Sequence, residues 1–119
     1  MITKPTININ GEDFQLATTL RVAFKIQGQN EHKPYARVFQ ELTDLPVEKQ
    51  IDMLYASFIC ANPEQTKVMT DKEFRDYCFD NMTIKDLMDL LQQVIKGIMG
   101  IDDETSNRNE DEYEDEEKN

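Results

Sequence analysis

The sequence has no tryptophan, only one histidine and only two cysteines among its 119 residues, and these shortages exclude several kinds of site. Cys60 and Cys78 do not form a CxxC pair and both lie among apolar neighbours, which favours free buried thiols over a disulfide or a metal site. The histidine, His32, lies between Glu31 and Lys33, as is typical of ordinary surface. We therefore expect no metal site built on these residues.

The signatures of catalysis are also missing. Each of the four glycines falls at a turn, a break or a helix end, so no glycine-rich loop could hold a phosphate. Asp86 and Asp89 fall on the polar side of a predicted helix, where carboxylates are typical of a solvated face. The acidic residues near the C-terminus lack the order of a calcium-binding loop. We expect a protein that is not an enzyme and needs no cofactor.

Long apolar runs and a signal peptide are absent, which predicts a cytoplasmic protein without a membrane span. The formal net charge of −11 is unevenly distributed. Residues 101–119 contain ten acidic and two basic side chains, a net −8, which leaves −3 for the rest of the chain. Because nucleic-acid phosphates would be repelled, direct binding to nucleic acid is not expected.

The composition changes abruptly after Gly100, where aliphatic side chains almost vanish. Such a segment cannot bury enough apolar surface to offset the entropy of ordering, which costs about 1–2 kcal/mol per residue. We therefore predict one folded domain over residues 1–100 and a disordered acidic tail over residues 101–119. The simplest role for that tail is to keep the domain in solution by charge repulsion.

The first secondary-structure signal is a β-hairpin around Asn10-Gly11. This dipeptide is favoured in two-residue type I′ turns because both positions need a positive φ. A turn there makes Ile9 and Glu12 the closing pair and sets Ile7 opposite Phe14. The side chains expected on the inward face are Ile7, Ile9, Phe14 and Leu16. Since an isolated hairpin is marginally stable in water, this face must pack against something else.

Helical spacing begins at Thr19, and a short first helix is expected to end near Gly28. Its expected inward residues are Leu20, Ala23 and Phe24, with Ile26 less clearly placed. Pro34 suits the first turn of a second helix, whose apolar positions are Tyr35, Val38, Phe39 and Leu42. A third helix should follow Pro46 and end at Asn62-Pro63. Its second half, MLYASFICA, is apolar on almost every side, which is typical of a central helix.

Two more helices complete the predicted fold. Thr70 and Glu73 form a capping-box pattern for the fourth helix, and Thr83 is placed to cap the fifth, which should run to Gly100. The predicted fold class is therefore mainly α (α+β), with an N-terminal two-stranded hairpin packed on a bundle of about five helices.

The fifth helix has an unusually wide apolar sector, about half of its circumference, compared with about 100° for an ordinary surface helix. One interpretation places this sector deep in a small core. The other leaves part of it for a second protein chain, and both can hold for different residues. The candidate partner-binding residues are Leu87, Leu90, Leu91, Val94, Ile95, Ile98 and Met99.

The order of TININGEDFQLATTLRVAFKI, TDKEFRDYC and IKDLMDLLQQVIKGIMG resembles the tail assembly chaperones of long-tailed (siphovirus) phages over residues 5–100. The resemblance implies a mainly α domain in the host cytoplasm, absent from the mature virion, that binds and solubilises the tape measure protein and assists tail-tube polymerisation. Residues 27–38, QGQNEHKPYARV, have no counterpart in that family.

The resemblance also implies further partners. The family makes a longer product by programmed translational frameshifting, and this chain would be the short product. The longer form would recruit tail tube protein, and copies of the chain could associate as a homo-oligomer. A competing hypothesis is an acidic DNA mimic or anti-defence protein that occupies a basic groove on a host protein. Deleting residues 101–119 separates the two, because only the mimic should lose its partner.

Overall fold

In the computed structural model, which describes residues 4–101, the N-terminal hairpin has the register that its turn residues predict. Strand β1 (Thr6–Ile9) pairs antiparallel with β2 (Glu12–Gln15), with Ile9 opposite Glu12 and Ile7 opposite Phe14. Asn10 and Gly11 have φ values of 55° and 88°, as a type I′ turn requires. The predicted hairpin is confirmed.

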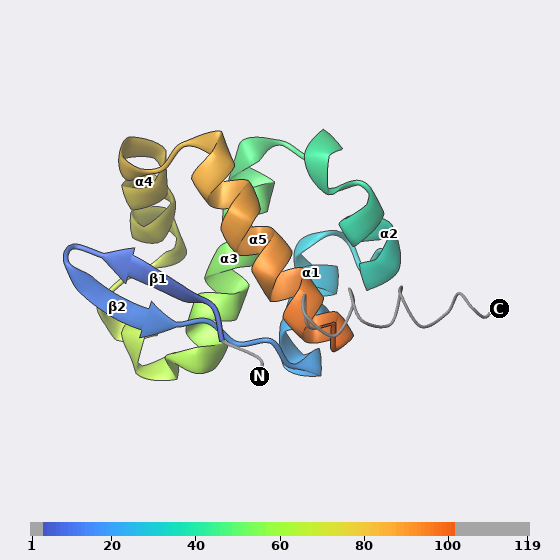
Figure 1. The fold of residues 1–119 in the computed structure, drawn as a ribbon, viewed down its shortest axis with the longest axis horizontal. Coiled ribbons are helices and arrows are strands. Elements are labelled where there is room, and N and C mark those ends of the chain that lie inside the picture. Colours follow the sequence, from blue (N-terminus) through green and yellow to red (C-terminus); the bar gives the residue numbers. More distant parts are fainter. Residues whose placement is uncertain (1–3, 102–119) are drawn as a thin grey trace, which may run out of the picture.

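The rest of the described chain is mostly helical (Figure 1). The elements are α1 (Leu20–Gln29), α2 (Tyr35–Gln40), α3 (Val47–Ala61), α4 (Asp71–Asn81) and α5 (Ile84–Met99), with short 3₁₀ turns η1 (Leu42–Asp44) and η2 (Pro63–Lys67). The predicted fold class is confirmed for residues 4–101. The predicted acidic tail, apart from Ile101, lies outside the described residues.

Helix α3 is central, as its apolar second half predicts. It contacts α1, α4, α5 and β2, and Met53, Leu54 and Phe58 are fully buried. The Phe58 ring packs edge-on against Phe14 of the hairpin, with ring centroids 5.3 Å apart, and stacks on Phe74 of α4 at 5.2 Å. The hairpin is thus held on the same aromatic cluster that joins α3 to α4.

The predicted caps form where the sequence places them. The Thr70 side chain accepts a hydrogen bond from Glu73 N, and the Thr83 side chain accepts one from Asp86 N; each partner carboxylate accepts one in return. Gly100 ends α5 in a left-handed conformation, which favours glycine. These local signals fix where α4 and α5 begin and where α5 ends.

The predicted inward face of α1 is wrong for Leu20 and Phe24 and confirmed for Ala23 and Ile26. Leu20 and Phe24 are 80% and 68% exposed, while Val22, Ala23 and Ile26 are buried. Five of the first seven residues of this short helix are apolar, so spacing alone does not choose between adjacent faces. Packing against α3 selects the edge that carries Val22 and Ile26.

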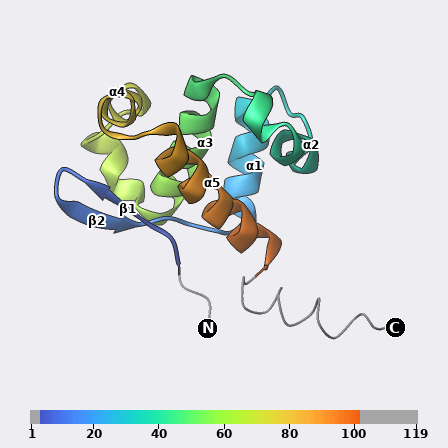
Figure 2. The ribbon, with the colours of Figure 1, turned by 45° about the horizontal axis from the view of Figure 1, so that its top comes forward.

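Helix α5 runs obliquely across α3, with α4 on one side of it and α1 on the other (Figure 2). It contacts both α3 and α1. Its two ends therefore lie over different neighbours, and this arrangement decides which parts of its apolar sector are covered.

Candidate functional site

The apolar sector of α5 divides into a buried centre and uncovered ends. Leu87, Leu91 and Val94 are buried in the core. Leu90, Ile95 and Ile98 are half-buried against that core, and Met99 is 52% exposed. The structure thus places three of the seven candidate partner-binding residues in the core and leaves the other four partly or largely uncovered, and partner binding by this set stays a prediction.

The apolar side chains left uncovered lie mainly outside that set. They are Leu20, Phe24, Tyr35, Val47, Val68, Phe79, Ile84, Met99 and Ile101. Three of them, Val47, Phe79 and Ile84, line one small cavity of about 130 Å³. We call this cavity, with its rim, the α3–α4–α5 notch.

The notch has an apolar floor and an apolar rim. Its floor includes Ile51, Cys78 and Leu87, all buried. On its rim, Ile84 is 74% exposed and Phe79 is 49% exposed. The volume is roughly that of four water molecules at about 30 Å³ each, which gives room for the end of one aliphatic or aromatic side chain. Such a cavity suits an anchor residue of a partner protein.

Local structure brings the notch together from three elements. Helix α3 begins at Val47, directly after Pro46, which occupies the N-cap position. Helix α4 ends at Asn81, and only two residues connect it to α5. The Thr83 capping box begins α5 at once, so that Phe79 and Ile84 both line the same hollow.

Two titratable groups at or beside the notch have shifted pKa values. Burial raises the pKa of the Cys78 thiol from 9.0 to about 12, so the thiol stays protonated at neutral pH and is a poor nucleophile. At the start of α5, hydrogen bonds from the backbone and side chain of Thr83 lower the pKa of Asp86. That carboxylate is therefore held in the capping box that begins α5.

The charged residues beside the notch are mostly acidic. Glu48 follows Val47 in the chain, Asp80 follows Phe79, and both are exposed. Lys85, next to Ile84, is paired with Asp89 at 2.8 Å. A partner with an apolar anchor and basic flanking residues would complement this rim.

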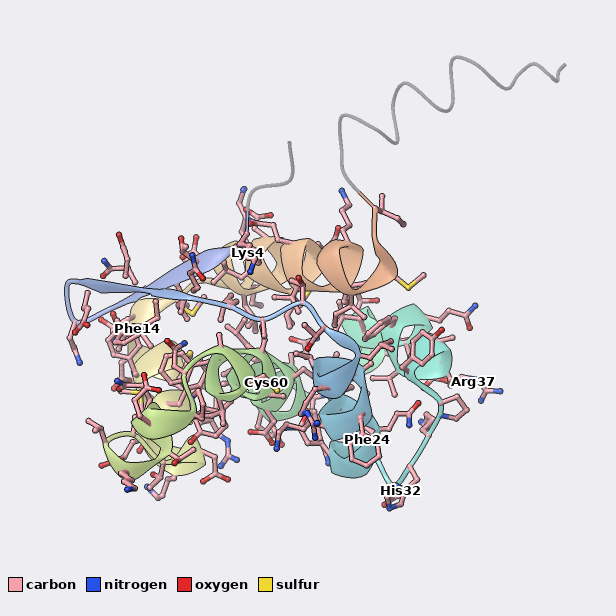
Figure 3. The ribbon with its side chains drawn as sticks, turned by 90° about the horizontal axis from the view of Figure 1, so that it is seen from below. Lys4, Phe14, Phe24, His32, Arg37 and Cys60 are labelled. Atoms are coloured by element: carbon pink, nitrogen blue, oxygen red, sulfur yellow. The ribbon has the colours of Figure 1, made fainter. Side chains whose placement is uncertain are left out.

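The remaining predicted features are placed as follows. Both cysteines are free, with Cys78 buried and Cys60 half-buried. His32 is exposed in the α1–α2 connection (Figure 3). Among residues 4–101, no three His, Cys, Asp or Glu side chains are grouped to hold a metal ion. No helix in that part of the chain is long and apolar enough to cross a membrane.

Sequence reasoning missed the notch because its rim residues come from three separate elements. Val47 directly follows Pro46 at the start of the third predicted helix, and Phe79 directly follows Cys78 in the fourth. The only indication in the sequence was that Phe79, a large aromatic residue, lies one position after the apolar residue Cys78. Comparisons with protein-family models, curated proteins and solved structures found no match to this chain.

Proposed function

We propose that this chain is a phage tail assembly chaperone, the short product of its gene, which binds and solubilises a tape measure protein during tail-tube polymerisation. The order of hairpin and helices supports this function through the resemblance described above. The observation that carries it is the α3–α4–α5 notch, where Val47, Phe79 and Ile84 remain uncovered around a cavity.

The physical requirements of such a chaperone agree with the domain. A long helical client with uncovered apolar stripes needs small, repeated apolar contacts that can later be released. A notch with room for one side chain would give a contact of moderate strength, and several copies could bind along one client. Recognition of an apolar helix face typically uses anchors three and four residues apart.

The acidic charge supports the same function. The chain carries a net charge of −11, so copies bound along one client would repel neighbouring complexes. In this proposal the longer frameshifted form of the chain delivers tail tube protein, and the work is done in the host cytoplasm.

Co-expression with a tape measure protein tests the function. The chaperone should keep that protein in the soluble fraction and co-purify with it. A chain ending at Ile101 should still bind, because the Ile101 N–H donates to Lys96 O and completes the end of α5. The functional proposal fails if neither form rescues or retains the client. Binding that disappears with residues 102–119 would instead favour an acidic mimic.

A further inference from the structure

A second hollow lies on a different side of α3 from the notch. It is a groove of about 540 Å³ between α1, α3, η2 and the start of α4. Helices α1 and α3 lie side by side beneath α5 in this region (Figure 3). Its floor includes Ala56 and Ile59 of α3, and its walls carry Gly28 and Asp71. The function proposed above does not use this groove.

Gly28 in the wall of the groove has no explanation within the fold. It lies in the last turn of α1, it does not have a positive φ, and a Cβ built on it would meet no atom within 4 Å. Glycine in a helix is less stable than alanine, so neither conformation nor packing accounts for it here. Because Gly28 has no side chain, a molecule bound in the groove could come close to the backbone of α1 at this position.

A polar cluster beside the groove contains two buried atoms without partners. The Gln29 Nε2 donates to Asp52 O at 2.9 Å, and the Arg75 guanidinium contacts Asp52 Oδ1 at 3.0 Å. Gln29 Oε1 and Arg75 Nε are buried and have no hydrogen-bond partner among the described residues. Buried polar groups are nearly always paired, and Gln29 is one of the residues that line the groove, so its unpaired acceptor favours a donor that enters from the groove.

Charged residues of both signs line the groove: Lys25 of α1, Asp52 of α3 and Asp71 of α4. Burial raises the pKa of Tyr55, and the negative charges of Asp71 and Glu73 raise it further. Burial also raises the pKa of Cys60, which follows the groove residue Ile59, but the positive charges of Lys25 and Arg21 oppose that effect. Asp52 is already paired with Arg75 at 3.0 Å, so a cationic group in the groove is favoured beside Asp71.

We propose that this groove binds the side chain of an arginine or lysine presented by a protein partner. The aliphatic stem would lie on Ala56 and Ile59, and the charged head would donate to Gln29 Oε1 and the Asp71 carboxylate. The partner's main chain would pass close to Gly28. This inference does not depend on the identity of the client, and it concerns a different surface from the notch.

The test uses the full chain and a small probe, Nα-acetyl-arginine methylamide, in a ¹⁵N NMR titration at about 0.15 M salt, where long-range charge effects are screened. The neutral isostere Nα-acetyl-citrulline methylamide is the matched control. We expect saturable shifts of the Gly28 backbone amide, the Gln29 side-chain amide and the Arg75 Nε–H with the arginine probe. The citrulline probe should leave these signals in place.

Two variants locate the binding. D71N should weaken binding of the arginine probe about twofold to fivefold, the range for loss of one exposed ion pair, and G28A should weaken it while the protein stays folded. E12Q, which removes an exposed carboxylate beside the hairpin turn, should leave the affinity unchanged. Equal shifts with citrulline, equal effects of D71N and E12Q, or no saturable shift at the groove would each overturn the proposal. The last result would mean that the groove holds only water.

Discussion

Gly97 of α5 lies directly against Thr18, the residue two positions before α1. A Cβ on Gly97 would come within 2.5 Å of Thr18 Cγ2 and 2.7 Å of Thr18 Cβ, distances that real atoms do not adopt. The missing side chain therefore sets how closely the last turn of α5 approaches the segment that leads from the hairpin into α1. The two glycines within helices thus differ, because Gly97 is required by packing and Gly28 is not.

This difference predicts opposite effects of two identical substitutions. G97A should lower the free energy of unfolding by about 1–2 kcal/mol, because overpacking costs about 1–3 kcal/mol and exceeds the helix propensity that alanine adds. G28A should raise the free energy of unfolding by up to about 1 kcal/mol. Urea denaturation measures both. Equal effects of the two variants would contradict the close contact at Thr18.

A second prediction separates the core of α5 from its exposed beginning. L87A should cost about 2–5 kcal/mol of stability, as expected for truncating a buried leucine. I84E should change stability by no more than about 0.5 kcal/mol because Ile84 is exposed, yet it should abolish co-purification with the client. If I84E binds normally while remaining folded, the notch is not the docking surface.

A third prediction concerns the two thiols. In the folded protein at pH 8, Cys60 should react with a thiol reagent well before Cys78, because Cys78 is buried and its pKa is raised to about 12. In a C60S variant, the remaining thiol should react only as fast as the protein opens. A fast reaction of Cys78 under native conditions would show that the floor of the notch is accessible to solvent.

The same raised pKa predicts a pH dependence of stability. The folded state keeps the Cys78 proton at pH values where the unfolded chain loses it, so this contribution to stability is complete below pH 9 and decreases as the pH rises towards 12. By pH 10 the loss should be on the order of 1 kcal/mol. Urea titrations of the wild type and C78A at pH 8 and pH 10 measure it. An equal loss in both proteins would assign the effect to other groups.

The chain beyond Ile101 gives a fifth prediction. If its charge keeps complexes apart, aggregation of the full chain should increase with ionic strength, because exposed charges more than about 10 Å apart interact little at 0.1 M salt. A chain ending at Ile101 should aggregate more readily and depend less on salt. Light scattering against salt concentration measures both. A solubility that neither salt nor truncation changes would remove this role for the acidic residues.

The elements that could be predicted from sequence are those specified by neighbouring residues. The register of the hairpin follows from Asn10-Gly11, and the starts of α4 and α5 follow from Thr70 and Thr83, because each signal acts within a few residues. The central position of α3 was predictable because its second half is apolar on almost every side.

The parts that could not be predicted depend on contacts between distant segments. The face that α1 turns inward is chosen by α3, which leaves Phe24 exposed although its spacing is that of a core residue. The centre of α5 is likewise buried by contacts with the distant helices α3 and α1. The notch joins Val47, Phe79 and Ile84, and the groove joins Gly28, Ile59 and Asp71, so neither has a local pattern that spacing could detect.

The most direct test of the proposed function is site-specific photocrosslinking to the co-expressed client. A photoreactive phenylalanine analogue at position 79 replaces a half-exposed phenylalanine on the rim of the notch, and the same analogue at position 92 replaces an exposed glutamine on α5. Crosslinking of the client at position 79 and its absence at position 92 is the predicted result. Crosslinking at position 92 with none at position 79 would contradict a client bound at the notch.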